Sequence, residues 1–174
     1  SGCTLIVLAE WKAPVYQNAV TLITSSIRRN GPANIDSKIH HNNLINNILA
    51  KIEANNAGAD DALMLDNNGF VAETNACNIF MIKNGMLFTP NADACLPGIT
   101  RKTVITLCQQ NNIPIHLKNI SLTEMYNADQ VFTTGTMGEL TAVKMIDGRA
   151  IINRSGTDLL QHINDLFRNL TLAL

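Results

Sequence analysis

The fold of this chain is decided by one stretch, Phe70-Val-Ala-Glu-Thr-Asn-Ala-Cys-Asn-Ile-Phe80, with Glu73 near its centre. Apolar residues flank Glu73, and the preceding Asp66-Asn-Asn-Gly69 has the composition of a hairpin turn. We therefore expect a strand that directs Glu73 into the protein. An unpaired buried carboxylate costs on the order of several kcal/mol, so Glu73 should be neutral or meet a cation, and a protonated pyridine ring is one such cation. The alternative is an edge strand on which Glu73 contacts water.

The composition is that of one globular domain that binds small molecules or other proteins. The chain has 174 residues, 46% of them hydrophobic and 16% charged, which is enough apolar material for a core. The net charge is -1 and the longest basic run is Arg28-Arg29, so no nucleic-acid or membrane surface is expected. The four cysteines lack C-x-x-C spacing and the histidines lack ligand spacing. We expect free thiols, no metal site and a cytoplasmic location.

Hydrophobic periodicity predicts a mixed α+β fold. Short runs rich in β-formers predict strands over residues 4–9, 20–24, 62–65, 113–117 and 130–134. Hairpins turning at 68–69 and 83–85 predict a meander of three or four antiparallel strands, and a third hairpin turns at 147–148. Helical spacing predicts helices over 44–58, 98–112 and 159–170, and Ser121-Leu-Thr-Glu124 is a capping box. The expected architecture is a set of antiparallel strands with covering helices.

Three features outside the Glu73 strand suggest chemistry. Lys38 lies on a loop just before a helix; its ordinary interpretation is a solvated lysine, and its functional one is an amine that forms a Schiff base. Gly98-Ile99-Thr100 opens a helix, and Gly135-Thr136 follows a strand. Each could be an ordinary helix start or turn, or could donate N–H and hydroxyl groups to a phosphate. Together with Glu73, these features fit pyridoxal phosphate, which needs a lysine, a carboxylate for its ring nitrogen and a phosphate cradle.

Five ordered segments resemble the motifs of the class IV (fold type IV) aminotransferases. This family includes branched-chain amino acid aminotransferases, which the chain resembles most, D-amino acid aminotransferases and aminodeoxychorismate lyases. The resemblance implies an antiparallel-rich sheet or pseudo-barrel with covering helices, the large C-terminal domain of the D-amino acid aminotransferase-like fold, over residues 18–174. Residues 1–17 would then be the end of a preceding small lobe and a linker. The segments are Asp36-Ser-Lys38, 43–54, 65–80, Leu96-Pro-Gly-Ile-Thr-Arg101 and 128–136.

The resemblance also implies a role for each matching residue. Lys38 matches the lysine that binds pyridoxal phosphate covalently and transfers a proton, and Glu73 matches the carboxylate on the ring nitrogen. Leu96 matches an apolar residue against the ring, while Asn78 supports the strand rather than the chemistry. The phosphate ligands would be Gly98, Ile99, Thr100, Gly135 and Thr136, and the N–H groups for a substrate carboxylate would come from Met137 and Gly138.

The chain also departs from the family pattern in three places. The spacing from Lys38 to Asn43 is a residue or so longer, and Asn43-Leu44 stands where branched-chain enzymes usually have Asn-Tyr. The family also has a smaller N-terminal lobe of roughly a hundred residues, with a phosphate-binding arginine for which this chain has no matching residue. Arg28 and Arg29 do not match that arginine.

The expected function is transfer of an amino group from an amino acid, with the branched-chain type favoured, to a 2-oxo acid such as 2-oxoglutarate. The parent protein is expected to be a homodimer, as is typical of the family. One alternative with the same cofactor is a lyase of the aminodeoxychorismate type, and another is a D-amino acid aminotransferase. An alternative of a different class is a catalytically incomplete lobe that only associates with a partner chain.

Overall fold

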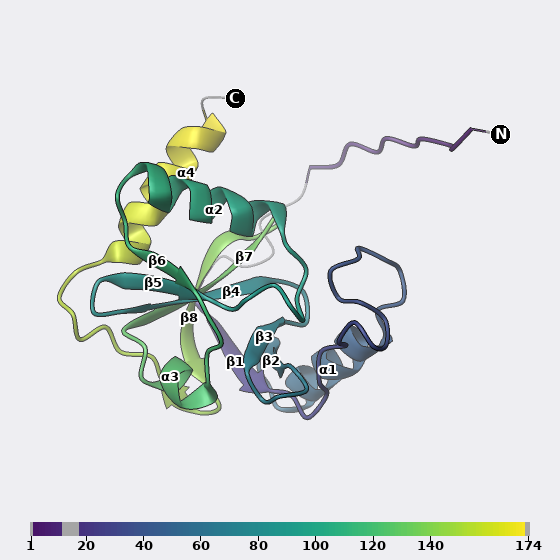
Figure 1. Ribbon diagram of the computed structural model, residues 1–174, viewed down its shortest axis with the longest axis horizontal. Helices are drawn as coiled ribbons and strands as arrows, with labels where there is room; N and C mark the ends of the chain where they lie inside the picture. Colours follow the sequence, from purple (N-terminus) through teal and green to yellow (C-terminus); the bar gives the residue numbers. More distant parts are fainter. Residues whose placement is uncertain (1, 12–17, 173–174) are drawn as a thin grey trace.

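Residues 2–11 and 18–172 are described by a computed structural model, in which one nine-stranded sheet curls into a half-barrel with helices around it (Figure 1). The strands are β1 (Val20–Thr24), β2 (Asp61–Leu65), β3 (Val71–Thr74), β4 (Asn78–Lys83), β5 (Met86–Thr89), β6 (Ile115–Leu117), β7 (Gln130–Gly135), β8 (Glu139–Ile146) and β9 (Arg149–Ala150). The helices are α1 (Ile45–Asn56), α2 (Ile99–Gln110), α3 (Leu122–Tyr126) and α4 (Leu159–Leu172). The mixed α+β class expected from the sequence is confirmed.

The strands run in the order β3-β2-β1-β8-β7-β4-β5-β6, with β9 on β8. Most neighbours are antiparallel, while β1 pairs in parallel with β2 and β8, and β5 with β6. The predicted meander is therefore wrong: β2–β3 and β4–β5 are hairpins, but β4 pairs with β7 and not with β3. The strands β3 and β4 still touch, because the short turn of residues 75–77 joins them. Pairing between strands so far apart in the chain carries no local signal.

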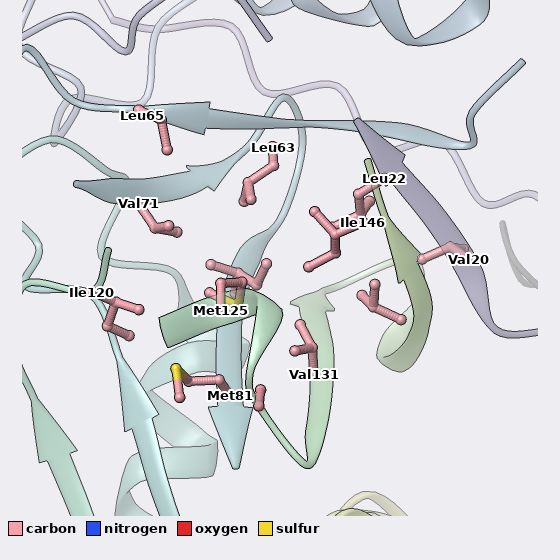
Figure 2. Close-up of a cluster of buried hydrophobic side chains, with 13 residues drawn as sticks. Val20, Leu22, Leu63, Leu65, Val71, Met81, Ile120, Met125, Val131 and Ile146 are labelled. Carbon is pink, nitrogen blue, oxygen red and sulfur yellow. The ribbon is translucent and has the colours of Figure 1, made fainter. Parts of the chain in front are cut away.

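Two main clusters of side chains fill the two faces of the sheet. The first lies inside the curl, where α3 covers the strands and Leu22, Leu63, Met81, Met125 and Ile146 meet (Figure 2). The second lies between the sheet and the helices α2 and α4, around the stacked rings of Phe80 and Phe132, whose centroids are 5.0 Å apart. Alternate residues of β4 and β7 serve opposite faces, as the period of a strand requires.

Helix α1 packs on the sheet through its small residues rather than its large ones. The predicted helix is present, but it buries Ala50 and Ala54 against Ala62 and Met64 of β2. Its charged residues bind within the chain: Lys51 contacts Asp60 and Asp61, and Glu53 accepts hydrogen bonds from Ser25 and Ser26. The outward face is therefore apolar and uncharged, with exposures of 42% to 54% at Ile45, Ile48, Leu49 and Ile52.

The strand predicted over residues 4–9 is not formed. This segment has no strand partner within the described part of the chain, and Leu5, Ile6, Val7 and Leu8 are 75% to 84% exposed. A strand needs a neighbour for its backbone hydrogen bonds. Residues 12–17, part of the predicted linker, lie outside the described residues. Among the helices of residues 2–11 and 18–172, none is long and apolar enough to span a membrane.

The Phe80–Phe132 stack should contribute strongly to stability. Phe132 is fully buried, so Phe132→Ala leaves a cavity and should lower the free energy of unfolding by about 3–5 kcal/mol. Leu172→Ala is a control, because Leu172 is 85% exposed and its truncation should change stability by less than about 0.5 kcal/mol. Chemical denaturation measures both, and equal midpoints for the two variants would contradict the assigned core.

Candidate active site

All eight residues expected to hold a cofactor line one cavity of about 540 Å³, here called the Lys38 cavity. It lies where the ends of β3, β4 and β7 meet the first turn of α2. Its walls bring together a loop lysine, a strand carboxylate, a helix start and the turn after β7. The lining residues are Lys38, His40, Glu73, Ala76, Asn78, Leu96, Pro97, Gly98, Ile99, Thr100, Thr134, Gly135 and Thr136.

Glu73 is buried on β3 and has a cationic partner within the chain. Its carboxylate Oε1 lies 2.7 Å from Arg29 Nε and 2.5 Å from Arg29 Nη2. Both side chains are less than a tenth exposed, so the pair is shielded from water. Burial raises the pKa of Glu73 to about 7, and the charge and hydrogen bonds of Arg29 oppose this rise. The cation expected opposite Glu73 is thus Arg29, which sequence reasoning did not identify.

Asn78 orients the other oxygen of Glu73. Its Nδ2 donates to Glu73 Oε2 at 3.0 Å and to the carbonyl of Leu96 at 2.8 Å. The backbone N–H of Leu96 donates to Glu73 Oε1 at 3.3 Å. Asn78 therefore positions the Glu73 carboxylate, in addition to its place on β4. Oε1 accepts three donors and Oε2 only one among the described residues, which leaves Oε2 with an acceptor position to spare.

Gly98 is required by the close approach of Asn78 to the start of α2. A Cβ at residue 98 would lie 2.3 Å from Asn78 Oδ1, so a larger residue would displace the amide that holds Glu73. Gly98 is the N-cap residue, and no side chain of the described residues caps the helix. The first N–H groups of α2, at Ile99 and Thr100, are therefore available to a ligand at the positive end of the helix dipole.

Thr134 adds an unexpected hydroxyl to this end of the cavity. It lies on β7 directly opposite Asn78 of β4, so both side chains project from the same face of the sheet. Thr134 is 2% exposed, and its Oγ1 has no hydrogen-bond partner in the part of the chain that the structure describes. An orphaned buried hydroxyl is costly and indicates a missing partner. Together with the uncapped helix start, it suits an anionic oxygen.

Lys38 reaches the cavity from the loop between β1 and α1. Ser37 Oγ donates to the carbonyl of Asn30 at 2.7 Å, and the N–H of Lys38 donates to Asp36 Oδ1 at 3.0 Å. The ammonium lies 3.7 Å from Asp36 Oδ2, with 43% of the side chain exposed. This ion pair must break before the amine can attack a carbonyl carbon.

Met137 and Gly138 line a neighbouring cavity of about 330 Å³, here called the Met137 cavity. It shares Ala76, Gly135 and Thr136 with the Lys38 cavity. Both predicted substrate residues therefore lie next to the cofactor residues without lining the same cavity. Met137 is 63% exposed in the turn between β7 and β8.

Sequence reasoning missed Arg29, Thr134 and the contacts of Asn78. The one available signal was the need of buried Glu73 for a cation, with Arg28-Arg29 directly after β1 as nearby candidates. What the sequence could not give is the parallel pairing of β1 with β2, which carries Arg29 beside the β2–β3 hairpin. No three His, Cys, Asp or Glu side chains of residues 2–11 and 18–172 form a group that could hold a metal ion.

Comparison with known proteins identifies the family. Residues 3–146 match the family model of amino-transferase class IV. Branched-chain-amino-acid aminotransferase-like protein 2 of Arabidopsis thaliana is 57% identical over 172 residues, which are 98% of this chain and 31% of that protein. The branched-chain-amino-acid aminotransferase of Pseudomonas aeruginosa is 40% identical over 154 residues, 84% of this chain and 50% of that protein.

Solved structures show the same fold. The branched-chain aminotransferase from Thermoproteus uzoniensis, crystallised with norvaline, matches with a TM-score of 0.84 at 35% identity, over 90% of this chain and 52% of that one. A second branched-chain amino acid aminotransferase has been solved with pyridoxamine 5'-phosphate and, separately, with 4-methylvaleric acid. With pyridoxamine 5'-phosphate it matches with a TM-score of 0.84 at 34% identity, over 91% of this chain and 54% of that one.

The chain spans from about a third to about half the length of these relatives. The family model covers most of the chain, and both curated relatives are of the branched-chain aminotransferase or aminotransferase-like type. The chain therefore belongs to the class IV aminotransferase family and is of the branched-chain aminotransferase-like type.

Proposed function

We propose that this chain forms the cofactor-binding part of a pyridoxal phosphate-dependent aminotransferase. It would move an amino group between an amino acid, with the branched-chain type favoured, and a 2-oxo acid such as 2-oxoglutarate. The observation that carries the proposal is the convergence on one cavity of a lysine, a buried carboxylate and an uncapped helix start. The family is pyridoxal phosphate-dependent, and the relative solved with pyridoxamine 5'-phosphate supports the same cofactor here.

The residues of the Lys38 cavity fit pyridoxal phosphate. Two independent features match the two ends of such a molecule. The spare acceptor position of Glu73 Oε2 suits the ring nitrogen, and the unpartnered hydroxyl of Thr134 suits the phosphate. The cofactor would supply an electron sink for the electrons released at the substrate carbon. Glu73 Oε2 would accept a hydrogen bond from the ring nitrogen, and the donors for the phosphate would be the N–H groups of Ile99 and Thr100 with the hydroxyls of Thr134 and Thr136.

The remaining residues would bind the cofactor covalently, contact its ring and hold the substrate. Lys38 would hold the cofactor covalently through its amine, once the amine has left Asp36, and would then accept and return a proton. Leu96 would present an apolar side chain to the ring. Met137 and Gly138 would offer backbone N–H groups to the substrate carboxylate, in keeping with the contact between their cavity and the Lys38 cavity.

The outward face of α1 supports the expected homodimer. Ile45, Ile48, Leu49 and Ile52 form an apolar face on which the helix carries no charge, because Lys51 and Glu53 are bound within the chain. A two-fold axis brings the same patch of two copies together. An uncharged patch can meet its own copy without repulsion between like charges, and exposed apolar patches mark association sites.

The titration of Glu73 should respond to Arg29. In the native chain the carboxyl should titrate near pH 7, so it is ionised above and protonated below that value. This native value exceeds the ordinary value of 4.5. Between pH 4.5 and 7 the folded chain keeps the carboxyl proton and the unfolded chain releases it, so the free energy of unfolding falls as pH rises through this range. Arg29→Met removes the opposing cation and should raise the pKa further. Carbon NMR of the carboxyl measures both midpoints, with exposed Arg28→Met as control; a lowered midpoint in Arg29→Met would contradict the pairing.

Chemical trapping tests the cofactor lysine. Pyridoxal phosphate added to the chain should give the visible absorption of a lysine-bound cofactor, and borohydride reduction followed by mass spectrometry should locate the adduct on Lys38. Lys38→Ala should lose the adduct, while Lys51→Ala should keep it because Lys51 lies outside the Lys38 cavity. An adduct on another lysine, or identical spectra for wild type and Lys38→Ala, would refute the lysine assignment. Absence of any cofactor binding would refute the proposed function.

Light scattering tests the dimer. The wild-type chain should have the mass of two copies, and Ile48→Lys should shift the population to single copies, because a charge would be buried at the apolar face of α1. Gln109→Lys places the same charge on an exposed position of α2 and should leave the mass unchanged. A wild-type chain that stays monomeric at high concentration would show that this face does not pair with its own copy.

A further inference from the structure

His40 lies where two cavities of the candidate site meet. It lines the Lys38 cavity and also an adjoining cavity of about 260 Å³, here called the Arg29 cavity. Three other residues line both, namely Glu73, Ala76 and Leu96. His40 is therefore the one residue of the loop segment 38–41 that borders both cavities together with the buried carboxylate. Neither the family motifs quoted above nor the proposed roles use it.

The imidazole of His40 is available for chemistry. Among the described residues no hydrogen bond to its ring is found, and the residue is exposed to the cavities. The two neighbouring basic side chains are both engaged: the ammonium of Lys38 pairs with Asp36, and His41 Nδ1 accepts the N–H of Asn43 at 3.1 Å. Of the basic residues on the loop segment 38–41, all of which the structure describes, His40 alone lines the Lys38 cavity without a hydrogen bond or ion pair to its side chain.

The chemistry of amino-group transfer leaves a task for such a nitrogen. An amino acid enters as an ammonium ion, which has no lone pair and cannot attack a carbonyl or imine carbon until it loses a proton. A Lys38 ammonium paired with Asp36 has no lone pair to take this proton, and neither does the Lys38 nitrogen when it is protonated while holding the cofactor. Glu73 is engaged by Arg29, Asn78 and the N–H of Leu96, and its spare acceptor position is assigned to the ring nitrogen.

We propose that His40 is the base that accepts the ammonium proton of the incoming amino acid. The neutral imidazole takes one proton from the ammonium, which gives a free amine and an imidazolium, and the exposed imidazolium then gives the proton to solvent water. No redox partner is needed. The charged or titratable residues that line these cavities with His40 are Lys38 and Glu73 in the Lys38 cavity, and Arg29, Glu73 and His41 in the Arg29 cavity. This inference rests on the proposed function.

Proton NMR of the four histidines gives a test that does not depend on activity. Pyridoxamine 5'-phosphate added to the wild-type chain should shift the ring signals of His40. His116, which stacks on Phe88, and His162 on α4 should not move. A shift of the Thr100 and Thr136 amides without a shift of His40 would overturn the role of His40 and leave the proposed function standing. No shift at any of these positions would overturn both.

Reaction with norvaline then tests the base itself. In the cofactor-loaded chain, His40→Gln should slow the change in cofactor absorbance on addition of norvaline by about 100-fold or more. The matched control, His41→Gln, should keep the wild-type rate.

An acid without an amine separates proton transfer from binding. 4-Methylvaleric acid, which one of the relatives binds in its solved structure, has no ammonium group to deprotonate. Its affinity should be the same for wild type and His40→Gln. Equal loss of norvaline reaction and 4-methylvaleric acid binding in His40→Gln would show a structural role and overturn the inference, as would an unchanged norvaline rate.

Discussion

The buried pair of Arg29 and Glu73 is the interaction on which the site depends. Arg29 is anchored at its backbone by a hydrogen bond to the carbonyl of Leu65, and its Nη1 donates to Asn47 Oδ1 of α1 at 2.7 Å. Asn47 in turn donates to the carbonyl of Asn75, in the turn after β3. The pair therefore ties together the end of β1, the β2–β3 hairpin and α1. Removing one member of a buried pair typically costs about 3–5 kcal/mol, since the other charge is left without compensation.

A second buried guanidinium acts on Glu73. Arg101, in the first turn of α2, is 5% exposed; its Nη2 donates to the carbonyl of Pro90, and its Nε has no partner among the described residues. Its charge also acts on Glu73 and opposes the rise of the pKa of that carboxyl. Two buried guanidinium groups thus lie near one buried carboxylate, next to the positive end of the α2 dipole. Such an arrangement is energetically costly without a ligand, because electrostatic energies are large in a low-dielectric interior. It therefore favours an anionic ligand.

Sequence reasoning succeeded where the determinants are local. The capping box of Ser121 and Glu124 and the turn at Asp147-Gly148 depend on residues within a few positions of one another, and both are present. It failed where the determinants are distant in the sequence. Arg29 meets Glu73, 44 positions away, only because β1 pairs with β2. The predicted meander does not form because β4 pairs with β7. Helix α1 is a different case: the predicted helix is present, but periodicity identifies an apolar face and not what covers it. Its large apolar residues face outward, while Ala50 and Ala54 allow close packing on β2.

The site divides into a rigid part and a loop part, and the two have different tasks. Glu73, Asn78 and Thr134 lie on strands, and Ile99 and Thr100 open a helix, so the groups suited to hold a ring nitrogen and an anion are fixed by the sheet. The two basic residues proposed for the chemistry, Lys38 and His40, lie by contrast on the irregular segment between β1 and α1, near the hydrogen bonds of Ser37 to Asn30 and of Lys38 to Asp36. Precise positioning is easier on strands and helices than on loops. In the function proposed above, affinity for the cofactor is therefore set by the strands and α2, while the placement of Lys38 and His40 in the loop decides whether the cofactor would react. Changes in that loop could separate binding from catalysis without disturbing the fold.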